Sequence, residues 1–171
     1  LQTNGSGALS WAAAAGGLTQ ADSWRLTTSF TGDADITSNL AQGVGYAGSG
    51  FGTLGDGMSE SSGAFTFPET GYWQVMAMFQ FRCSCDVTDC TGAIRVTVDD
   101  TNYTEHTQTD VALAGTHINS YSSIFVYALV DVEDTALVKV KFRVSVPSAS
   151  VQTYAGVPGQ TSFHFIRLGD T

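Results

Sequence analysis

Positive charge is scarce in this chain of 171 residues. Only 7 residues are Lys or Arg, against 16 Asp or Glu, and the formal net charge is −9. A nucleic-acid-binding surface needs clustered cations to neutralise phosphates, and attachment to an anionic membrane needs them as well. The composition therefore argues against nucleic acid and against an anionic membrane surface as partners.

Long apolar runs are also missing from the sequence. No stretch reaches the ~18 apolar residues that a membrane-spanning helix requires, so we expect no membrane insertion. The chain starts at Leu1, without an initiator methionine and without the basic segment that opens a signal peptide. We therefore expect a fragment or a processed product.

Signatures of catalysis are absent as well. The sequence has no G-x-S-x-G motif, and its Gly-rich segment 41–57 lacks the Lys-Ser/Thr ending of a phosphate-binding loop. Pairs of carboxylates, which glycosidases use, occur only where turns are predicted, and Asp is common in turns for backbone reasons. We predict a non-enzymatic protein, with a glycan-cleaving enzyme as a remote alternative.

Cysteine is limited to three residues, Cys83, Cys85 and Cys90, which lie within one short segment. An odd number leaves at least one thiol unpaired or paired between chains. We predict that a Cys85–Cys90 disulfide closes a hairpin turn over 86–89 and that Cys83 is a small buried hydrophobe. The alternative is a metal site with a histidine as fourth ligand, but the spacing differs from the C-x2-C units of zinc sites.

What the sequence does contain is short apolar alternation separated by turn residues. Hydrophobic residues make up 43% of the chain, charged residues only 13%, and there are 19 glycines. This composition is typical of a sheet protein with many turns. We predict an all-β antiparallel sandwich of ten strands over residues 22–171, preceded by a connector at residues 1–21.

The clearest signal is the segment 63–83, which reads as strand, tight turn and long strand. Pro68 ends the first strand because it has no N–H to donate, and Gly71 supplies positive φ for the turn. The strand that follows is apolar on both faces. Its first face consists of Trp73, Val75, Ala77, Phe79 and Phe81, and its second includes Tyr72, Met76 and Met78.

Two further strands, 121–130 and 161–168, are also apolar on both faces, whereas 136–146 has Lys and Arg along one face. One sandwich core covers only one face of a sheet, so the second apolar face needs another subunit. We therefore predict an interface between identical subunits. Its residues are Tyr72, Met76, Met78, Ile124, Val126, His164 and Ile166.

The pattern Phe65-x-x-Pro68-x-x-Gly71, entering a long apolar strand, resembles the tumour-necrosis-factor-like jelly rolls, which include the globular heads of the complement first component. Residues 121–144 and 161–168 fit later segments of the same family in the same order. The resemblance implies a homotrimer in which the two-faced strands surround the threefold axis. Some members bind calcium near the top of the trimer, so carboxylates at 99–100 or 131–134 are candidate ligands; otherwise we expect no cofactor.

The first eleven residues, LQTNGSGALSW, resemble the lead-in to C-terminal heads of viral, particularly phage, fibre and virion structural proteins. We therefore predict a trimeric fibre head or capsid-decorating spike on the exposed surface of a virion. Its expected partners are other copies of itself, other virion proteins, and a host-surface glycan or protein. The alternative is a secreted, extracellular TNF-like or lectin-like ligand-binding module of a cellular organism.

Aromatic residues in loops and on polar strands are the candidate receptor contacts, since such residues often carry recognition. They are Tyr46, Phe51, Tyr103 and Tyr154. His164 lies in a strand between two phenylalanines. On the threefold axis it could make the trimer sensitive to acid, because three imidazolium groups would repel one another.

Overall fold

The fold consists of β-strands in the part of the chain that the structure describes. The computed structural model covers residues 2–3, 9–10, 17–43, 52–114, 119–155 and 160–171. Within these ranges there is no helix, and hence none long and apolar enough to cross a bilayer. The predicted all-β class is confirmed.

The described residues form fifteen strands, and thirteen of these, β3 to β15, belong to the sandwich for which the sequence predicted ten. In chain order they are β1 (Gln2–Thr3), β2 (Leu9–Ser10), β3 (Ala21–Leu26), β4 (Phe30–Thr31), β5 (Ala34–Asp35), β6 (Leu40–Gln42), β7 (Ser59–Ser61), β8 (Ala64–Thr66), β9 (Gly71–Cys83), β10 (Val87–Thr97), β11 (Thr104–Leu113), β12 (Ser120–Val132), β13 (Lys139–Ser145), β14 (Gln152–Thr153) and β15 (Ser162–Gly169). The additional strands are short, two or three residues each, and too brief to show alternation in the sequence.

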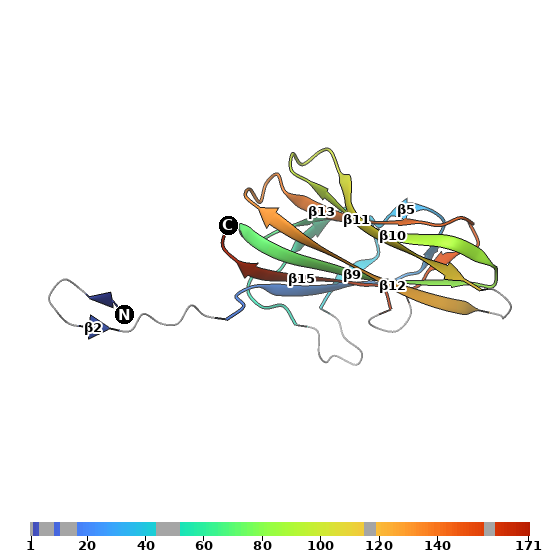
Figure 1. The fold of residues 1–171 in the computed structure, drawn as a ribbon, viewed down its shortest axis with the longest axis horizontal. Coiled ribbons are helices and arrows are strands. Elements are labelled where there is room, and N and C mark those ends of the chain that lie inside the picture. Colours follow the sequence, from blue (N-terminus) through green and yellow to red (C-terminus); the bar gives the residue numbers. More distant parts are fainter. Residues whose placement is uncertain (1, 4–8, 11–16, 44–51, 115–118, 156–159) are drawn as a thin grey trace.

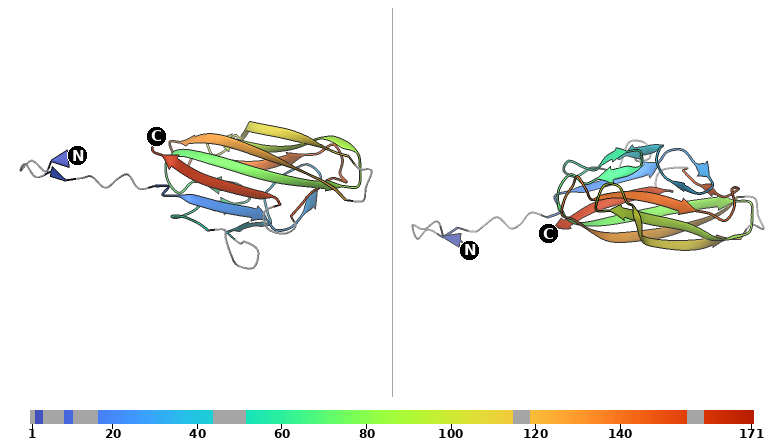
Figure 2. Two further views of the ribbon diagram at one scale, coloured as in Figure 1. Left: turned by 60° about the horizontal axis from the view of Figure 1, so that its bottom comes forward. Right: turned by 90° about the horizontal axis from the view of Figure 1, so that it is seen from above.

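Two antiparallel sheets pack face to face in layers (Figures 1 and 2). Sheet I has β12 and β9 at one side and continues through β15 and β14 to β3, β4 and β6. Sheet II consists of β11, β10, β13, β5, β8 and β7. The strands β1 and β2 pair only with each other, antiparallel, within the described ranges.

Aromatic side chains fill the space between the sheets. Phe65 of sheet II contacts Trp24, Phe163 and Phe165 of sheet I, with ring centroids 5.2 to 6.2 Å apart. Phe142 stacks on Phe163 with centroids 4.0 Å apart. Rings from both sheets therefore form one continuous core, whose burial is the main source of stability.

The strand β9 has the two faces that its sequence predicts. Trp73, Val75, Ala77, Phe79 and Phe81 are at most 1% exposed and point into the core. The intervening residues are half-buried or exposed on the outer side. The turn before the strand also agrees with its sequence: Gly71 has φ 131°, and a Cβ there would lie 2.3 Å from the Gly169 carbonyl oxygen.

Two connections differ from the predicted hairpins. The segments 121–130 and 136–146 were expected to pair, but β12 pairs with β9 in sheet I and β13 pairs with β10 in sheet II. The predicted hairpin turn at 86–89 is likewise a crossing from β9 to β10, made by residues 84–86. Two strands that follow each other in sequence and each have one apolar face show the same sequence pattern in both arrangements. They can pair in one sheet or lie in opposite sheets across the core.

The sandwich has two distinct ends. At the base, the Arg167 N–H donates to the Gln20 carbonyl oxygen over 3.0 Å, and Gly169 pairs with Tyr72. At the opposite end, the tip, Cys83 at the end of β9 pairs with Ser120 at the start of β12. The chain therefore enters β3 and leaves β15 at the base (Figure 1). The 13 residues of β9 span about 40 Å from base to tip.

Candidate subunit interface and other candidate sites

A set of exposed apolar side chains lies on the outer side of sheet I, and we call it the apolar face. Phe125, Tyr127 and Leu129 of β12 are 55%, 66% and 55% exposed. They lie opposite Met78, Met76 and Gln74 of β9, which are paired in turn with Ser162, His164 and Ile166 of β15. Tyr72 and Leu168 extend this face toward the base, at 39% and 53% exposure.

The structure corrects two of the residues predicted for this face. Ile124 and Val126 are only 8% and 3% exposed, and both belong to the core. They are paired with Phe79 and Ala77, which point inward. Both faces of β12 are apolar in sequence, so the pattern did not show which one the core would take. The outer side chains of β12 are Tyr121, Phe125, Tyr127 and Leu129.

The other five predicted interface residues are placed on the outer side of sheet I. Tyr72 is exposed, and Met76, Met78, His164 and Ile166 are half-buried. The pKa of Tyr72 is raised, first by the charge of Asp131, its cross-strand neighbour, and then by a hydrogen bond to the same carboxylate. Whether these residues contact another subunit stays a prediction.

His164 occupies the middle of this face in a half-buried position. Its Nδ1 lies 3.0 Å from the Ser23 hydroxyl and its Nε2 lies 3.2 Å from the Ser162 hydroxyl. Burial lowers the pKa of the imidazole below its ordinary value. The neutral form is therefore favoured in the folded protein.

Because the folded state disfavours imidazolium, His164 should make the protein less stable in acid. The unfolded chain binds the proton near pH 6.5, so the free energy of unfolding falls as pH drops below about 6.5 toward the lower pKa of the folded state. We expect His164→Gln to show a smaller loss than the wild type between about pH 7.5 and pH 5 in urea unfolding. Equal losses in both proteins would contradict this role.

The four aromatic receptor-contact candidates do not form one site. Tyr46 and Phe51 lie outside the described residues. Tyr103 is half-buried beside sheet II, with the Lys141 Nζ 4.3 Å from its ring centroid. Tyr154 lies at the tip of sheet I, where its ring centroid is 5.5 Å from that of Tyr121.

The two acidic segments considered as calcium ligands take part in local contacts, and in the segment 131–134 the Asp134 carboxylate accepts a hydrogen bond from the Ala136 N–H over 2.7 Å. The Asp99 carboxylate accepts hydrogen bonds from the backbone N–H groups of Thr101 and Asn102 and from the Asn102 side chain. These bonds lower its pKa, the Asn102 backbone having the largest effect. Asp100 pairs with Lys139. Among the described residues no group of three or more His, Cys, Asp or Glu is arranged to hold a metal ion.

The cysteine pairing differs from the prediction. Cys83 is bonded to Cys85, with Cα atoms 5.2 Å apart, and Cys90 is a buried free thiol. The predicted Cys85–Cys90 bond is therefore wrong. Cys90 belongs to β10 and faces the core from sheet II, whereas Cys83 and Cys85 lie together where the chain leaves sheet I. Burial, with a smaller effect from Asp89, raises the pKa of Cys90 to about 11.

Thiol counting distinguishes the two pairings. In denaturant without reductant we expect one reactive thiol in the wild type and none in Cys90→Ala, because Cys83 and Cys85 are bonded to each other. In the folded wild type, Cys90 should react slowly because it is buried and its thiolate is scarce. Two thiols in denatured Cys90→Ala would indicate a Cys85–Cys90 bond instead.

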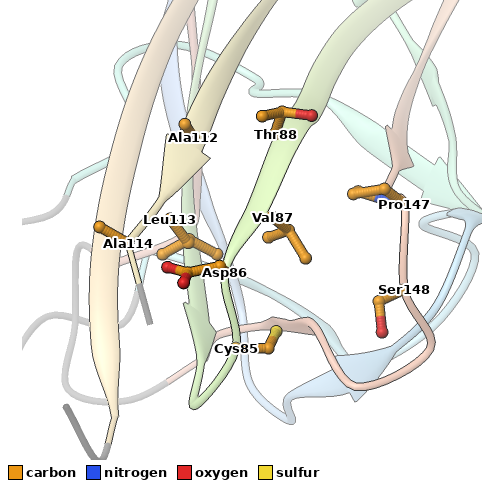
Figure 3. Close-up of a pocket in the computed structure, with 9 residues that line it drawn as sticks. All are labelled: Cys85, Asp86, Val87, Thr88, Ala112, Leu113, Ala114, Pro147 and Ser148. Carbon is orange, nitrogen blue, oxygen red and sulfur yellow. The ribbon is translucent and has the colours of Figure 1, made fainter. Parts of the chain in front are cut away.

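An open pocket of about 660 Å³ lies near the tip between the start of β10, the end of β11 and the segment after β13. Figure 3 shows Val87 on one side of the opening and Pro147 and Ser148 on the other, with Asp86 beside Leu113. Catalytic acid and base pairs need two titratable groups. This lining supplies one carboxylate and a cysteine that is held in a disulfide.

A buried carboxylate that the sequence did not single out organises the opposite edge of sheet I. Asp22 is 2% exposed, and its Oδ2 accepts hydrogen bonds from Trp24 Nε1, Gln42 Nε2 and the Met58 N–H at 2.7 to 2.8 Å. Its Oδ1 accepts from the Ser23 N–H and the Thr53 hydroxyl. The residue joins β3 to Gln42 and Thr53 within the Gly-rich segment and to Met58 just after it, which no local sequence pattern indicates.

No protein-family model matches the chain, and no curated protein matches it. Solved structures do match. Eiger TNF from S. frugiperda superposes with a TM-score of 0.63 and 14% sequence identity, over 88% of this chain and 93% of that one. Murine APRIL at pH 5.0 superposes with a TM-score of 0.60 and 11% identity, over 87% and 98%.

The chain has the TNF-like jelly-roll fold. This confirms the fold that the segment 63–83 predicts. Murine APRIL at pH 8.5 gives the same result with a TM-score of 0.57. At 10 to 14% identity the likeness establishes the fold alone.

Proposed function

We propose that the chain is a non-enzymatic binding module that assembles as a homotrimer through the apolar face of sheet I. The observation that carries this proposal is the exposure of Phe125, Tyr127 and Leu129, each more than half accessible on an otherwise well-packed strand. Monomeric soluble proteins rarely expose contiguous apolar patches of this kind. Three aromatic or aliphatic side chains in consecutive outward positions indicate a surface that is covered in the functional protein.

Copies of the same chain are the partner that best fits this face. The apolar face lies on the sheet whose strands, in the resemblance described above, surround a threefold axis. A closed cyclic assembly buries the same patch on every subunit and leaves no copy of it exposed. The TNF-like fold supports this choice, and it supports a role in binding rather than catalysis. We assign residues 22–171 to the head and residues 1–21 to a connector.

The setting that the comparisons favour is an extracellular ligand module of a cellular organism. The structural matches named above include a TNF from S. frugiperda and murine APRIL, both from cellular organisms. A virion head remains a second candidate because of the lead-in LQTNGSGALSW, in which β1 pairs with β2. A signal peptide and collagen-like or coiled-coil repeats upstream in the gene would support the first setting. A cluster of fibre or virion genes would support the second.

The assembly is tested by measuring the molar mass in solution with light scattering at neutral pH. We expect three times the 18.0 kDa of one chain. A stable monomer at micromolar concentration would overturn the proposal, because the apolar face would then be exposed to water. A mass of two chains would show that the face is an interface with a different symmetry.

A further inference from the structure

At the tip, the outer side of sheet I changes from apolar to polar. Next to Phe125, the Gln80 Nε2 donates to the Ser123 hydroxyl over 3.1 Å. Beyond that pair, one row of cross-strand neighbours runs over four strands. It consists of Thr31 in β4, Gln152 in β14, Arg82 in β9 and Tyr121 in β12. Paired residues on adjacent strands point to the same side, so these side chains share the outer surface.

Arg82 is the only cation in this row, and two tyrosines hold its side chain. Its guanidinium carbon lies 5.2 Å from the Tyr154 ring centroid and 5.9 Å from that of Tyr121. Its Nε donates to the Asn119 Oδ1 over 3.0 Å. Within the described residues Arg82 forms no ion pair, whereas Arg95, Arg143 and Arg167 all do. The guanidinium is therefore positioned, and among the described residues no group accepts a hydrogen bond from its two terminal nitrogens.

A pocket of about 380 Å³ lies beside this guanidinium. Its lining includes Thr31, Ser84 and Ser150, whose side chains carry hydroxyls, and Asn119 and Gln152, whose side chains carry amides. Ligand sites for small molecules have volumes of a few hundred Å³ and a few convergent polar groups. This pocket combines one planar cation with several neutral groups that can both donate and accept hydrogen bonds.

We propose that this pocket binds the carboxylate of an acidic sugar. The two terminal nitrogens of Arg82 match the two oxygens of a carboxylate, in the bidentate pairing that Arg forms best. The hydroxyls and amides around it match the hydroxyl groups of a sugar ring. This inference rests on the proposed binding function and names a ligand class for it.

Charge and position both favour an acidic sugar over other anions. A chain of net charge −9 repels densely charged anionic polymers. A single carboxylate, in contrast, needs only one guanidinium to pair with. Apart from the Cys83–Cys85 disulfide the lining residues are polar, so the pocket offers little apolar surface to the side chains of a bound peptide. The site lies at the tip, away from the base where the chain enters and leaves (Figure 1). In a trimer, three such sites would raise the avidity for a surface that bears many sugars.

The proposal is tested by titrating ¹⁵N-labelled protein with glucuronic acid and with N-acetylneuraminic acid while following amide and Arg Nε–H resonances. Glucose and acetate serve as the neutral sugar and the simple carboxylate. We expect saturable shifts at Arg82, Asn119 and Ser150 for at least one sugar acid, and much weaker ones for glucose and acetate. Arg82→Gln should weaken binding roughly tenfold or more, because it removes a charge-assisted bidentate contact.

Two further variants keep the test decisive. Ser150→Leu adds bulk to the lining without touching Arg82 and should also weaken binding. Arg143→Gln removes a cation that pairs with Asp35 on sheet II and should bind as the wild type does. The proposal is overturned if neither sugar acid gives saturable shifts at the pocket, if Arg82→Gln binds equally well, or if acetate or glucose binds as tightly as the sugar acids.

The outcome is separable from that of the trimer proposal. The pocket residues named here come from within one subunit, so we expect a monomer to bind as well. Light scattering on the same samples reports the mass of each variant. A monomer that binds the sugar acid would overturn the trimer and leave the pocket standing, whereas a trimer that does not bind would do the reverse.

Discussion

Tyr127→Asp should convert the assembled protein into a monomer. The Tyr127 side chain is 66% exposed in a single subunit, so a carboxylate there does not disturb the core of that subunit. In a trimer closed through the apolar face, three carboxylates would lose their water and lie near one another. The desolvation penalty is several kcal/mol for each ion, and 1.4 kcal/mol already changes an association constant about tenfold. Light scattering should report a mass of 18.0 kDa.

Val98→Asp is the matched control for this substitution. Val98 is 71% exposed and follows β10 of sheet II, away from the apolar face. This variant also exchanges an exposed apolar side chain for a carboxylate, yet it should remain assembled. Circular dichroism should show that both variants keep the fold. If Tyr127→Asp sediments as a trimer, the apolar face is not the interface.

Asp22→Asn should reduce the free energy of unfolding by about 2–4 kcal/mol, because a buried carboxylate with several donors becomes an amide. The amide keeps one acceptor oxygen, but it places an NH2 group where the second carboxylate oxygen of the wild type accepts hydrogen bonds. If the amide nitrogen takes the place of Oδ2, it faces Trp24 Nε1, Gln42 Nε2 and the Met58 N–H. At least one buried donor is then left without a partner.

The Asp22 prediction is measured by urea unfolding, with Asp110→Asn as the control. Asp110 is an exposed residue of β11, so the same chemical change there should cost less than about 0.5 kcal/mol. Hydrogen exchange should also increase at the Met58 N–H in Asp22→Asn, since this donor is held by the carboxylate. Equal unfolding midpoints for Asp22→Asn and the wild type would show that the carboxylate does not stabilise this edge.

The fold could be predicted where local pattern and tertiary structure agree. In β9, strict alternation of large apolar side chains between Pro68 and Cys83 gave both the strand and its buried face, and the structure confirms them. Gly71 was assigned positive φ from its turn, and it has it. At these positions the local backbone conformation and the packing of the core favour the same residue types. The sequence pattern therefore predicts both the strand and its buried face.

Prediction failed where two arrangements have the same local pattern. Both faces of β12 are apolar, so the sequence pattern assigns Ile124 and Val126 to the interface, whereas in the structure they meet the core. Strands β12 and β13 are adjacent in sequence and each has an apolar face, which suits a hairpin as well as two opposed layers. The cysteine spacing likewise allowed several pairings. In the structure Cys90 lies in sheet II and faces the core, while Cys83 and Cys85 are bonded to each other.

The pocket at the tip could not be found from the sequence. Its row comes from positions 31, 82, 121 and 152, which are joined only by the pairing of four strands. Tyr154 was singled out as an exposed aromatic, but the sequence gave no sign that it packs against Arg82. Asp22 is a similar case, because the groups that surround its carboxylate are up to 36 residues away along the chain.

The meeting of Gln20 and Arg167 at the base makes this domain a practical scaffold for protein engineering. The backbones that enter and leave the sandwich are joined there by one hydrogen bond of 3.0 Å. A short Gly-Ser peptide could therefore join residues 19 and 170, and new termini could be opened elsewhere. By the same geometry, the whole sandwich could be inserted into a surface loop of another protein, with the tip directed away from its carrier.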